Sequence, residues 1–156
     1  MFRATSGRIV PDVIWMLRHG DAEDGGGKPD SERELTSKGE RQSRDAGMAL
    51  KELGVQLDVC ISSPKVRARQ TAELACAELG VAVELDERLA GGDFDPYEIA
   101  AGRGEVMLVG HEPDFSRAVA MATGSRVKFK KGGVVAFDDH LLHALLRPKD
   151  LREIAG

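Results

Sequence analysis

The stretch VIWMLRHGDAEDGGGKPD, residues 13–30, changes character abruptly. Residues 13–17 form a short apolar run with β-branched and aromatic members, which is typical of a buried strand. Arg18, His19 and Gly20 follow directly, and a loop of acids, glycines and a proline comes next. Packing alone gives no reason for a buried strand to end in an arginine and a histidine. The stretch therefore predicts a chemical site at the end of a central strand.

Apolar runs like this one recur along the chain and alternate with helical patterns. Further strands are predicted over residues 57–61, 81–85 and 105–110. Between them, apolar residues at helical spacing and residues that favour helix ends predict helices. These helices begin at Ser37, at Pro64, within the stretch DPYEIA and at Pro113. Ser37 opens a Ser-x-x-Glu capping box, and the three longer helices end at Gly54, Gly80 and Gly124.

The C-terminal part of the chain has a different pattern. The runs VVAF and LLHALL flank Asp138, Asp139 and His140, which predicts a hairpin along the sheet edge. The β-α-β-α order of the preceding residues predicts an α/β fold with a mainly parallel sheet covered by helices on both faces. Because 156 residues suit one core, we expect a single domain over residues 1–156.

Composition excludes several classes of partner. The net charge of −4 argues against duplex nucleic-acid binding, and the aromatic content of 4% argues against base stacking. The N-terminal stretch MFRATSGRIVPD lacks the apolar core of a signal peptide, and no run approaches membrane-spanning length. We therefore expect a cytoplasmic protein with no nucleic-acid or membrane partner. Cys60 and Cys76 lie in apolar segments and are expected to be buried free thiols.

Polar side chains follow three of the predicted strands. Sheets of this kind bind ligands at the carboxyl ends of their strands. Arg18 and His19 end the first strand, Arg67 lies in the first turn of the helix after the second, and His111 follows the fourth. Two arginines and two histidines are thus expected to converge at one edge of the sheet.

This set of residues suits phosphoryl transfer. Arginine offers paired donors that match phosphate oxygens, and fixed cations stabilise the charge of a phosphoryl group in flight. A neutral imidazole can attack phosphorus and hold the phosphoryl group until water removes it. Gly20 allows a close backbone approach, which leaves a carbonyl to fix the tautomer of His19.

Four motifs in order carry a resemblance to a known family. The stretches LRHGDAE, ELTSKGERQ, ISSPKVRARQTAE and LVGHEPDFS resemble the histidine phosphatase superfamily, also called phosphoglycerate mutase-like. The short length and the ending LLRPKDL most resemble the small SixA-type phosphohistidine phosphatases. The resemblance implies a three-layer α/β/α sandwich and chemistry without a metal or other cofactor. It also implies that His19 is the phosphorylated nucleophile, that Arg18 and Arg67 bind phosphate oxygens, and that His111 contacts the transferring group.

One further catalytic residue and the substrate stay open. Larger branches use a carboxylate after the third strand as general acid, and Glu87 in LDERLAGGD fits that place; it fits equally an exposed glutamate paired with Arg88. The chain contains no asparagine and has no room for lid insertions, which favours phosphohistidine on another protein as substrate. A small phosphate ester is the alternative substrate. Two alternatives belong to other classes of function: a non-catalytic phosphate-binding module, and a metal site formed by His19 and His111.

Three other features are expected to lie outside the chemistry. His140 and His143 suit turn and sheet-surface roles in the hairpin. The loop DGGGKPDSE, residues 24–32, borders the pocket at most and offers no catalytic group. The basic stretch VKFKKGG, residues 127–133, is typical of a solvated sheet edge; a docking surface for an acidic partner is the alternative.

Overall fold

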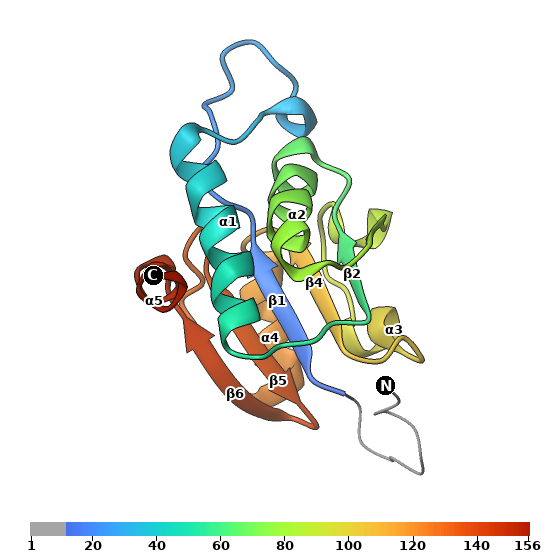
Figure 1. Cartoon of the computed structure of the whole chain (residues 1–156). Helices are drawn as coiled ribbons and strands as arrows, with labels where there is room; N and C mark the ends of the chain where they lie inside the picture. Colours follow the sequence, from blue (N-terminus) through green and yellow to red (C-terminus); the bar gives the residue numbers. More distant parts are fainter. Residues whose placement is uncertain (1–11) are drawn as a thin grey trace.

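A computed structural model describes residues 12–156 of the chain. The expectation for the N-terminal stretch therefore falls largely outside the described residues. One sheet of six strands runs through the molecule in the order β3-β2-β4-β1-β5-β6 (Figure 1). The strands are β1 (Ile14–Arg18), β2 (Val59–Ser62), β3 (Val83–Leu85), β4 (Val106–Gly110), β5 (Val134–Asp138) and β6 (Leu141–Leu146).

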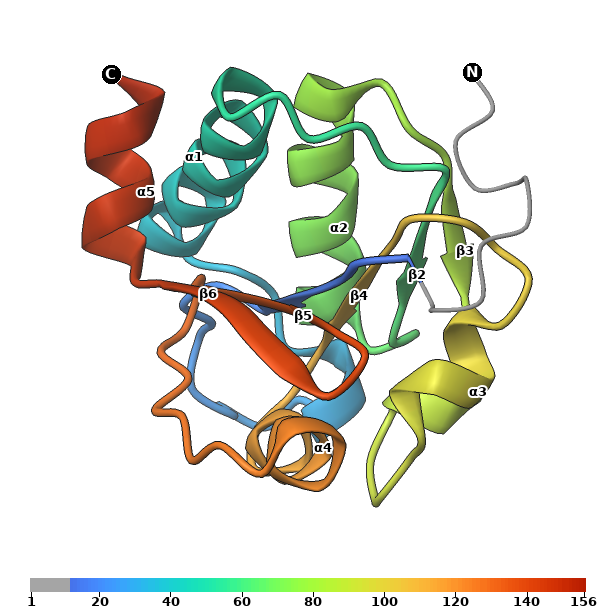
Figure 2. The same ribbon diagram turned by 90° about the horizontal axis from the view of Figure 1, so that it is seen from below.

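Helices cover both faces of this sheet, as Figure 2 shows. The α-helices are α1 (Ser37–Glu52), α2 (Val66–Leu79), α3 (Pro96–Ala100), α4 (Asp114–Thr123) and α5 (Pro148–Ala155), and two short 3-10 helices are η1 (Asp30–Glu32) and η2 (Glu87–Leu89). On one face lie α1, α2 and α5, and on the other lie α3 and α4. Strands β3, β2, β4 and β1 are parallel, whereas β5 and β6 pair antiparallel at the edge. The predicted α/β/α sandwich with a C-terminal hairpin is confirmed.

Strand β1 is apolar up to its last residue, Arg18, because both of its faces are covered. Ile14 and Met16 belong to the core on the α4 side, together with Phe115, and are at most 1% exposed. Leu17 belongs to the core on the α1 and α2 side, together with Leu50. Burial on both faces explains why residues 13–17 show no alternation of polar and apolar residues.

Helix α1 begins at Ser37 as predicted, but its N-cap and the start of α2 differ from the prediction. Thr36, not Ser37, is the N-cap of α1, and its Oγ1 accepts a hydrogen bond from the Gly39 amide at 3.1 Å. Helix α2 begins two residues after Pro64, because the Ser63 hydroxyl accepts the Lys65 amide in a tight turn at 3.2 Å. Side-chain hydrogen bonds of this kind fix the exact first residue of a helix, and the apolar pattern does not record them.

Helix α5 was not predicted as a helix. Pro148 occupies its first turn, and the Asp150 carboxylate accepts the Arg147 amide at 2.9 Å. Leu151 anchors the helix against the α1 side of the sheet and is fully buried. Such a short helix owes its stability to this packing rather than to its own propensity.

Candidate active site

Backbone hydrogen bonds join the carboxyl ends of the central strands. The His19 amide donates to the Gly110 carbonyl at 3.0 Å, and the Ser63 amide donates to the Val109 carbonyl at 2.9 Å. The segments that follow β1, β2 and β4 are therefore held side by side just beyond the sheet. This arrangement brings His19, Arg67 and His111 together, and each is only 5–6% exposed.

His19 is held in one orientation and one tautomer. Its Nδ1 lies 2.7 Å from the Gly20 carbonyl oxygen, which can only accept, so Nδ1 carries the proton and Nε2 keeps its lone pair. Burial lowers the pKa of His19 to about 4; the Gly20 hydrogen bond opposes this shift, and the charges of Arg67 and Arg18 add to it. The ring is consequently neutral at physiological pH. The predicted contact between this ring and a backbone carbonyl is present.

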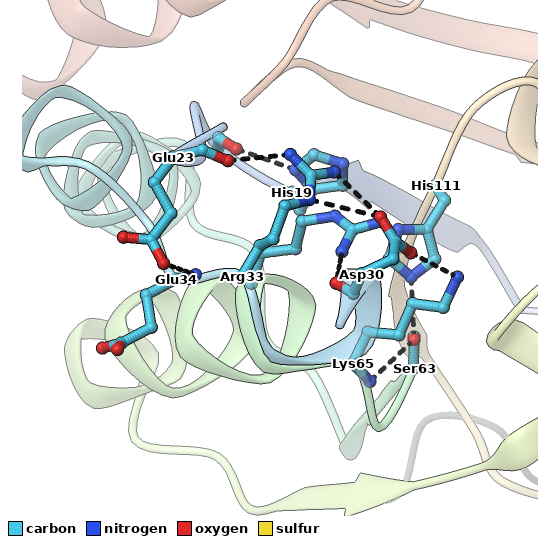
Figure 3. Close-up of polar contacts among 10 residues, drawn as sticks. His19, Glu23, Asp30, Arg33, Glu34, Ser63, Lys65 and His111 are labelled. Carbon is cyan, nitrogen blue, oxygen red and sulfur yellow. Dashed lines mark hydrogen bonds and ion pairs between the residues drawn. The ribbon is translucent and has the colours of Figure 1, made fainter. Parts of the chain in front are cut away.

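His111 faces His19 from the end of β4. The two ring centroids are 5.2 Å apart, and the rings are inclined by 53°. The Nε2 atom of His111 lies 2.8 Å from the Ser63 hydroxyl, as Figure 3 shows. Burial lowers the pKa of His111 to about 3, and the charges of His19, Arg67 and Lys65 act in the same direction. A second neutral imidazole thus lies against the first.

Both arginines have donors to spare. The Arg18 guanidinium donates one hydrogen bond to the Phe129 carbonyl at 2.8 Å, and Arg67 donates to the Asp30 carbonyl at 2.8 Å. Within residues 12–156, the buried Nε atoms of both arginines and Nδ1 of His111 have no hydrogen-bond partner. Leaving such groups unpaired costs about 1–3 kcal/mol each. An oxyanion bound among these side chains offers acceptors for the arginine donors.

Asp30 is a residue of the pocket that sequence reasoning did not single out. Its carboxylate lies 3.2 Å from Lys65 Nζ, 3.3 Å from an Arg67 nitrogen and 3.2 Å from Arg33 (Figure 3). Burial opposes ionisation, but hydrogen bonds from Lys65 and Arg67 and their charges lower the pKa of Asp30 to about 2. Asp30 lies in η1, in a loop without periodicity. The Asp-x-x-Arg spacing of Asp30 and Arg33 was the available signal.

Glu87 lies in η2 after β3 and is exposed. Its neighbour Arg88 pairs with Asp86 at 2.7 Å and with Glu98 at 3.4 Å, so the expected pairing of Glu87 with Arg88 is replaced. Among the described residues, Glu87 has no hydrogen bond or ion pair to the pocket. Its catalytic role stays a prediction.

Two glycines let α1 approach the histidine loop. A Cβ atom on Gly39 would lie 2.0 Å from the Asp21 carbonyl oxygen, and one on Gly20 would lie 2.6 Å from the Gly39 carbonyl oxygen. On the other side of the loop, Thr71 accepts the Gly20 amide and donates to the Arg67 carbonyl, at 3.1 and 2.8 Å. The residue after the histidine is therefore fixed to both helices.

Other predicted features lie where the sequence placed them. His140 bonds to the Ala122 carbonyl at 2.8 Å and His143 pairs with Asp138 at 2.6 Å, both in the hairpin. Cys60 and Cys76 are buried free thiols.

In the described part of the chain, no three His, Cys, Asp or Glu side chains are grouped so that they could hold a metal ion. Nor does any helix in residues 12–156 have the length and apolarity to cross a membrane.

The fold and this cluster of arginines and histidines define a class of phosphate-handling α/β proteins, and comparison with known proteins identifies the family. The model of the histidine phosphatase superfamily (branch 1) matches residues 14–118. An uncharacterized protein of Picosynechococcus sp. is 35% identical over 87% of this chain and 96% of its own length. The mitochondrial serine/threonine-protein phosphatase Pgam5 of Drosophila ananassae is 39% identical over 42% of this chain and 22% of its own length.

Solved structures agree with the family model. A protein histidine phosphatase SixA complexed with tungstate has a TM-score of 0.77 and 25% identity, over 89% of this chain and 99% of its own. SixA from Agrobacterium tumefaciens has a TM-score of 0.79 at 24% identity, over 88% and 99% of the two chains, which shows the common fold. The chain belongs to the histidine phosphatase superfamily and resembles its SixA-type branch, as its motifs predicted. Family and neighbours together support phosphatase activity.

Proposed function

We propose that this chain is a phosphohistidine phosphatase in which His19 forms a covalent phosphoryl intermediate. In the first step His19 Nε2 attacks phosphorus, an N–P bond forms, and the bond from phosphorus to the substrate imidazole breaks. The released imidazole is neutral because its other ring nitrogen carries a proton. In the second step water attacks phosphorus, inorganic phosphate leaves, and His19 returns to its neutral form. Arg18, Arg67 and His111 contact the transferring group, and residues 1–156 act as one phosphatase domain.

The observation that carries this proposal is the state of His19. A ring with Nδ1–H bonded to the Gly20 carbonyl at 2.7 Å and a pKa near 4 is an unprotonated nucleophile at neutral pH. Arg67 adjoins it and supplies a fixed positive charge for the phosphoryl oxygens. These steps need neither a metal ion nor an organic cofactor.

The preference for phosphohistidine depends on which leaving groups need a proton donor in the pocket. An alkyl phosphate ester releases a poor leaving group unless a general acid protonates it. Asp30, which contacts Arg67, has a pKa of about 2 and is ionised at neutral pH, so it has no proton to give. A phosphohistidine needs no such donor, because its ring already carries a proton and leaves as a neutral imidazole. The pocket therefore suits phosphohistidine better than a sugar-phosphate ester.

A side-by-side turnover assay tests this function. The substrates are a peptide phosphorylated on histidine, p-nitrophenyl phosphate and glycerol phosphate, and chelator is added in a parallel series. We expect turnover of the first two, little of the third, and no effect of chelator. His19→Ala should lower turnover by more than about a thousandfold, while His143→Ala, in the exposed hairpin, should not.

Two outcomes would contradict the proposal. Phosphate binding without turnover of any of these substrates would make the chain a phosphate-binding module. Efficient hydrolysis of glycerol phosphate, abolished by Glu87→Gln, would establish Glu87 as the general acid. The chain would then be a phosphomonoesterase that acts on small esters.

A further inference from the structure

The cations of the chain are concentrated in one place beside the candidate site. A groove of about 1080 Å³ is lined by residues of α1, of α5 and of the segment 128–131. Ten of the chain's 22 lysines and arginines line this basic groove, but only two of its 26 acidic residues, Asp21 and Asp45, do so. In a chain with a net charge of −4, the groove is strongly positive and the remaining surface strongly negative.

Three separate segments build the walls of the basic groove. Helix α1 contributes Lys38, Arg41 and Arg44. The segment before β5 contributes Lys128, Lys130 and Lys131, and the C-terminal helix α5 with its cap contributes Arg147, Lys149 and Arg152. Helices α1 and α5 lie side by side, as Figures 1 and 2 both show.

Lys131 and Arg147 pair with Asp21 and Asp150, but most of these cations have no acidic partner among residues 12–156. Arg41, Arg44 and Lys130 are exposed, and none forms an ion pair with another residue of the described range 12–156. Several exposed cations elsewhere are paired, for example Arg88 with Asp86 and Arg103 with Glu84 at 2.7 and 2.6 Å. A group of exposed, unpaired like charges is unfavourable by itself and is relieved by an anionic partner.

The basic groove adjoins the segment that carries the proposed nucleophile. Arg18, the residue before His19, lines it, and its guanidinium donates to the carbonyl of Phe129 in the opposite wall. Gln42, also in the lining, accepts the amide of Asp21 just after the histidine loop. The groove therefore lies next to the candidate site, and Arg18 belongs to both.

We propose that the basic groove binds an acidic surface of the phosphorylated protein substrate, next to the phosphohistidine that enters the pocket. This inference rests on the proposed function and adds the chemistry of the partner. Met48 and Pro148 supply apolar surface between the cations, as a protein partner requires. The aromatic residue of the lining, Phe129, is only 3% exposed, so it offers no face for stacking bases. These features favour a protein over a nucleic acid.

Two phosphohistidine peptides test the groove. One carries glutamates around the phosphorylated histidine and the other carries glutamines, and both are matched in length. At low ionic strength we expect kcat/KM of the full-length chain to be about tenfold higher for the glutamate peptide, with the difference shrinking as salt is added. Arg44→Glu/Lys130→Glu should abolish this preference and leave p-nitrophenyl phosphate turnover unchanged.

A matched variant controls for net charge. Arg103→Glu/Arg126→Glu changes the net charge equally outside the groove lining and should keep the preference. Equal turnover of both peptides, or a preference that survives Arg44→Glu/Lys130→Glu, would overturn the proposal.

A binding measurement separates this inference from the proposed function. Fluorescence anisotropy follows the unphosphorylated glutamate peptide as it binds wild type and Arg44→Glu/Lys130→Glu, whether or not phosphohistidine is hydrolysed. Weaker binding to the groove variant supports the proposal even if turnover fails. Binding of single-stranded DNA or inorganic polyphosphate to the groove in preference to the peptide would overturn it.

Discussion

His19 and His111 present two imidazoles in a pocket that also contains arginine. Burial is the main cause that lowers their pKa values, to about 4 and about 3, and neighbouring positive charge contributes. An ordinary histidine, with a pKa near 6.5, is partly protonated at neutral pH and to that extent has no lone pair for attack. The same burial therefore keeps the proposed nucleophile unprotonated.

His19 should stay unprotonated, and therefore active as a nucleophile, well below neutral pH. Because the pKa of His19 is about 4, the ring stays unprotonated from about pH 7 to about pH 5. We expect the dependence of kcat/KM for p-nitrophenyl phosphate on pH in this range to follow only the ionisation of the substrate. Titration of nitrogen-15-labelled rings, assigned with His19→Gln, measures the pKa directly. A midpoint for His19 near 6.5 would contradict this account.

The same shifts should make the fold sensitive to acid. The unfolded chain binds protons at both histidines near pH 6.5, whereas the folded chain does so only near pH 4 and pH 3. Stability is therefore lost as the pH falls through the window from about 6.5 to 4, by roughly 3 kcal/mol for His19 alone. Urea unfolding at several pH values should show this slope, reduced in His19→Gln. An unchanged slope in that variant would show that His19 is not its source.

Asp30 places a negative charge beside the proposed phosphate site. Its carboxylate lies 3.3 Å from Arg67 and is 57% exposed, so its effect is screened. Removing the charge in Asp30→Asn should strengthen inhibition by inorganic phosphate about fivefold, or about 1 kcal/mol. Asp24→Asn, in the same loop, is the matched control. Weaker phosphate inhibition in Asp30→Asn would instead assign Asp30 to holding Arg67 in position.

Sequence and structure agree at the residues that follow strands. Arg18, His19, Arg67 and His111 could be placed together because the ends of neighbouring parallel strands share one sheet edge. Asp30 could not be placed in this way. It reaches Arg67 through a loop without periodicity, and the position of such a residue depends on contacts with another helix.

At the scale of elements, the approach of α1 to the histidine loop depends on Gly39. Gly39→Ala would place a methyl group 2.0 Å from the Asp21 carbonyl oxygen, so backbone must move. We expect a loss of about 1–3 kcal/mol in unfolding free energy and lower turnover, because the loop also holds His19. Gly91→Ala is the control, since a Cβ there meets nothing within 4 Å. Equal stability of the two variants would refute the proposed role of this contact.

Elements were predicted where they had a strong apolar pattern. Strand β1 and helices α1, α2 and α4 followed from periodicity and from glycines at helix ends. Helix α5 has eight residues and one fully buried side chain, Leu151, so its pattern is too short to stand out. The exact cap of a helix, such as Thr36 for α1, depends on a single side-chain hydrogen bond.

At the scale of the whole molecule, the distribution of charge could be predicted only in part. The stretch 127–133 was recognisable as basic from the sequence. The sequence alone does not show that it faces cations of α1 and α5, because these segments lie far apart along the chain and meet only in the fold. The net charge of the chain is negative although the groove beside the pocket is positive, so the net charge alone does not predict the charge of this surface.

In the proposed site, one oxyanion lies among two arginines and two histidines, with His19 as the attacking group. A crystal structure of the chain with orthovanadate tests this most directly, because vanadate adopts the geometry of a phosphoryl group in flight. We predict a vanadium atom bonded to His19 Nε2, with its oxygens contacted by Arg18, Arg67 and His111. Vanadate bound elsewhere, or bound without contact to His19, would show that His19 is not the nucleophile.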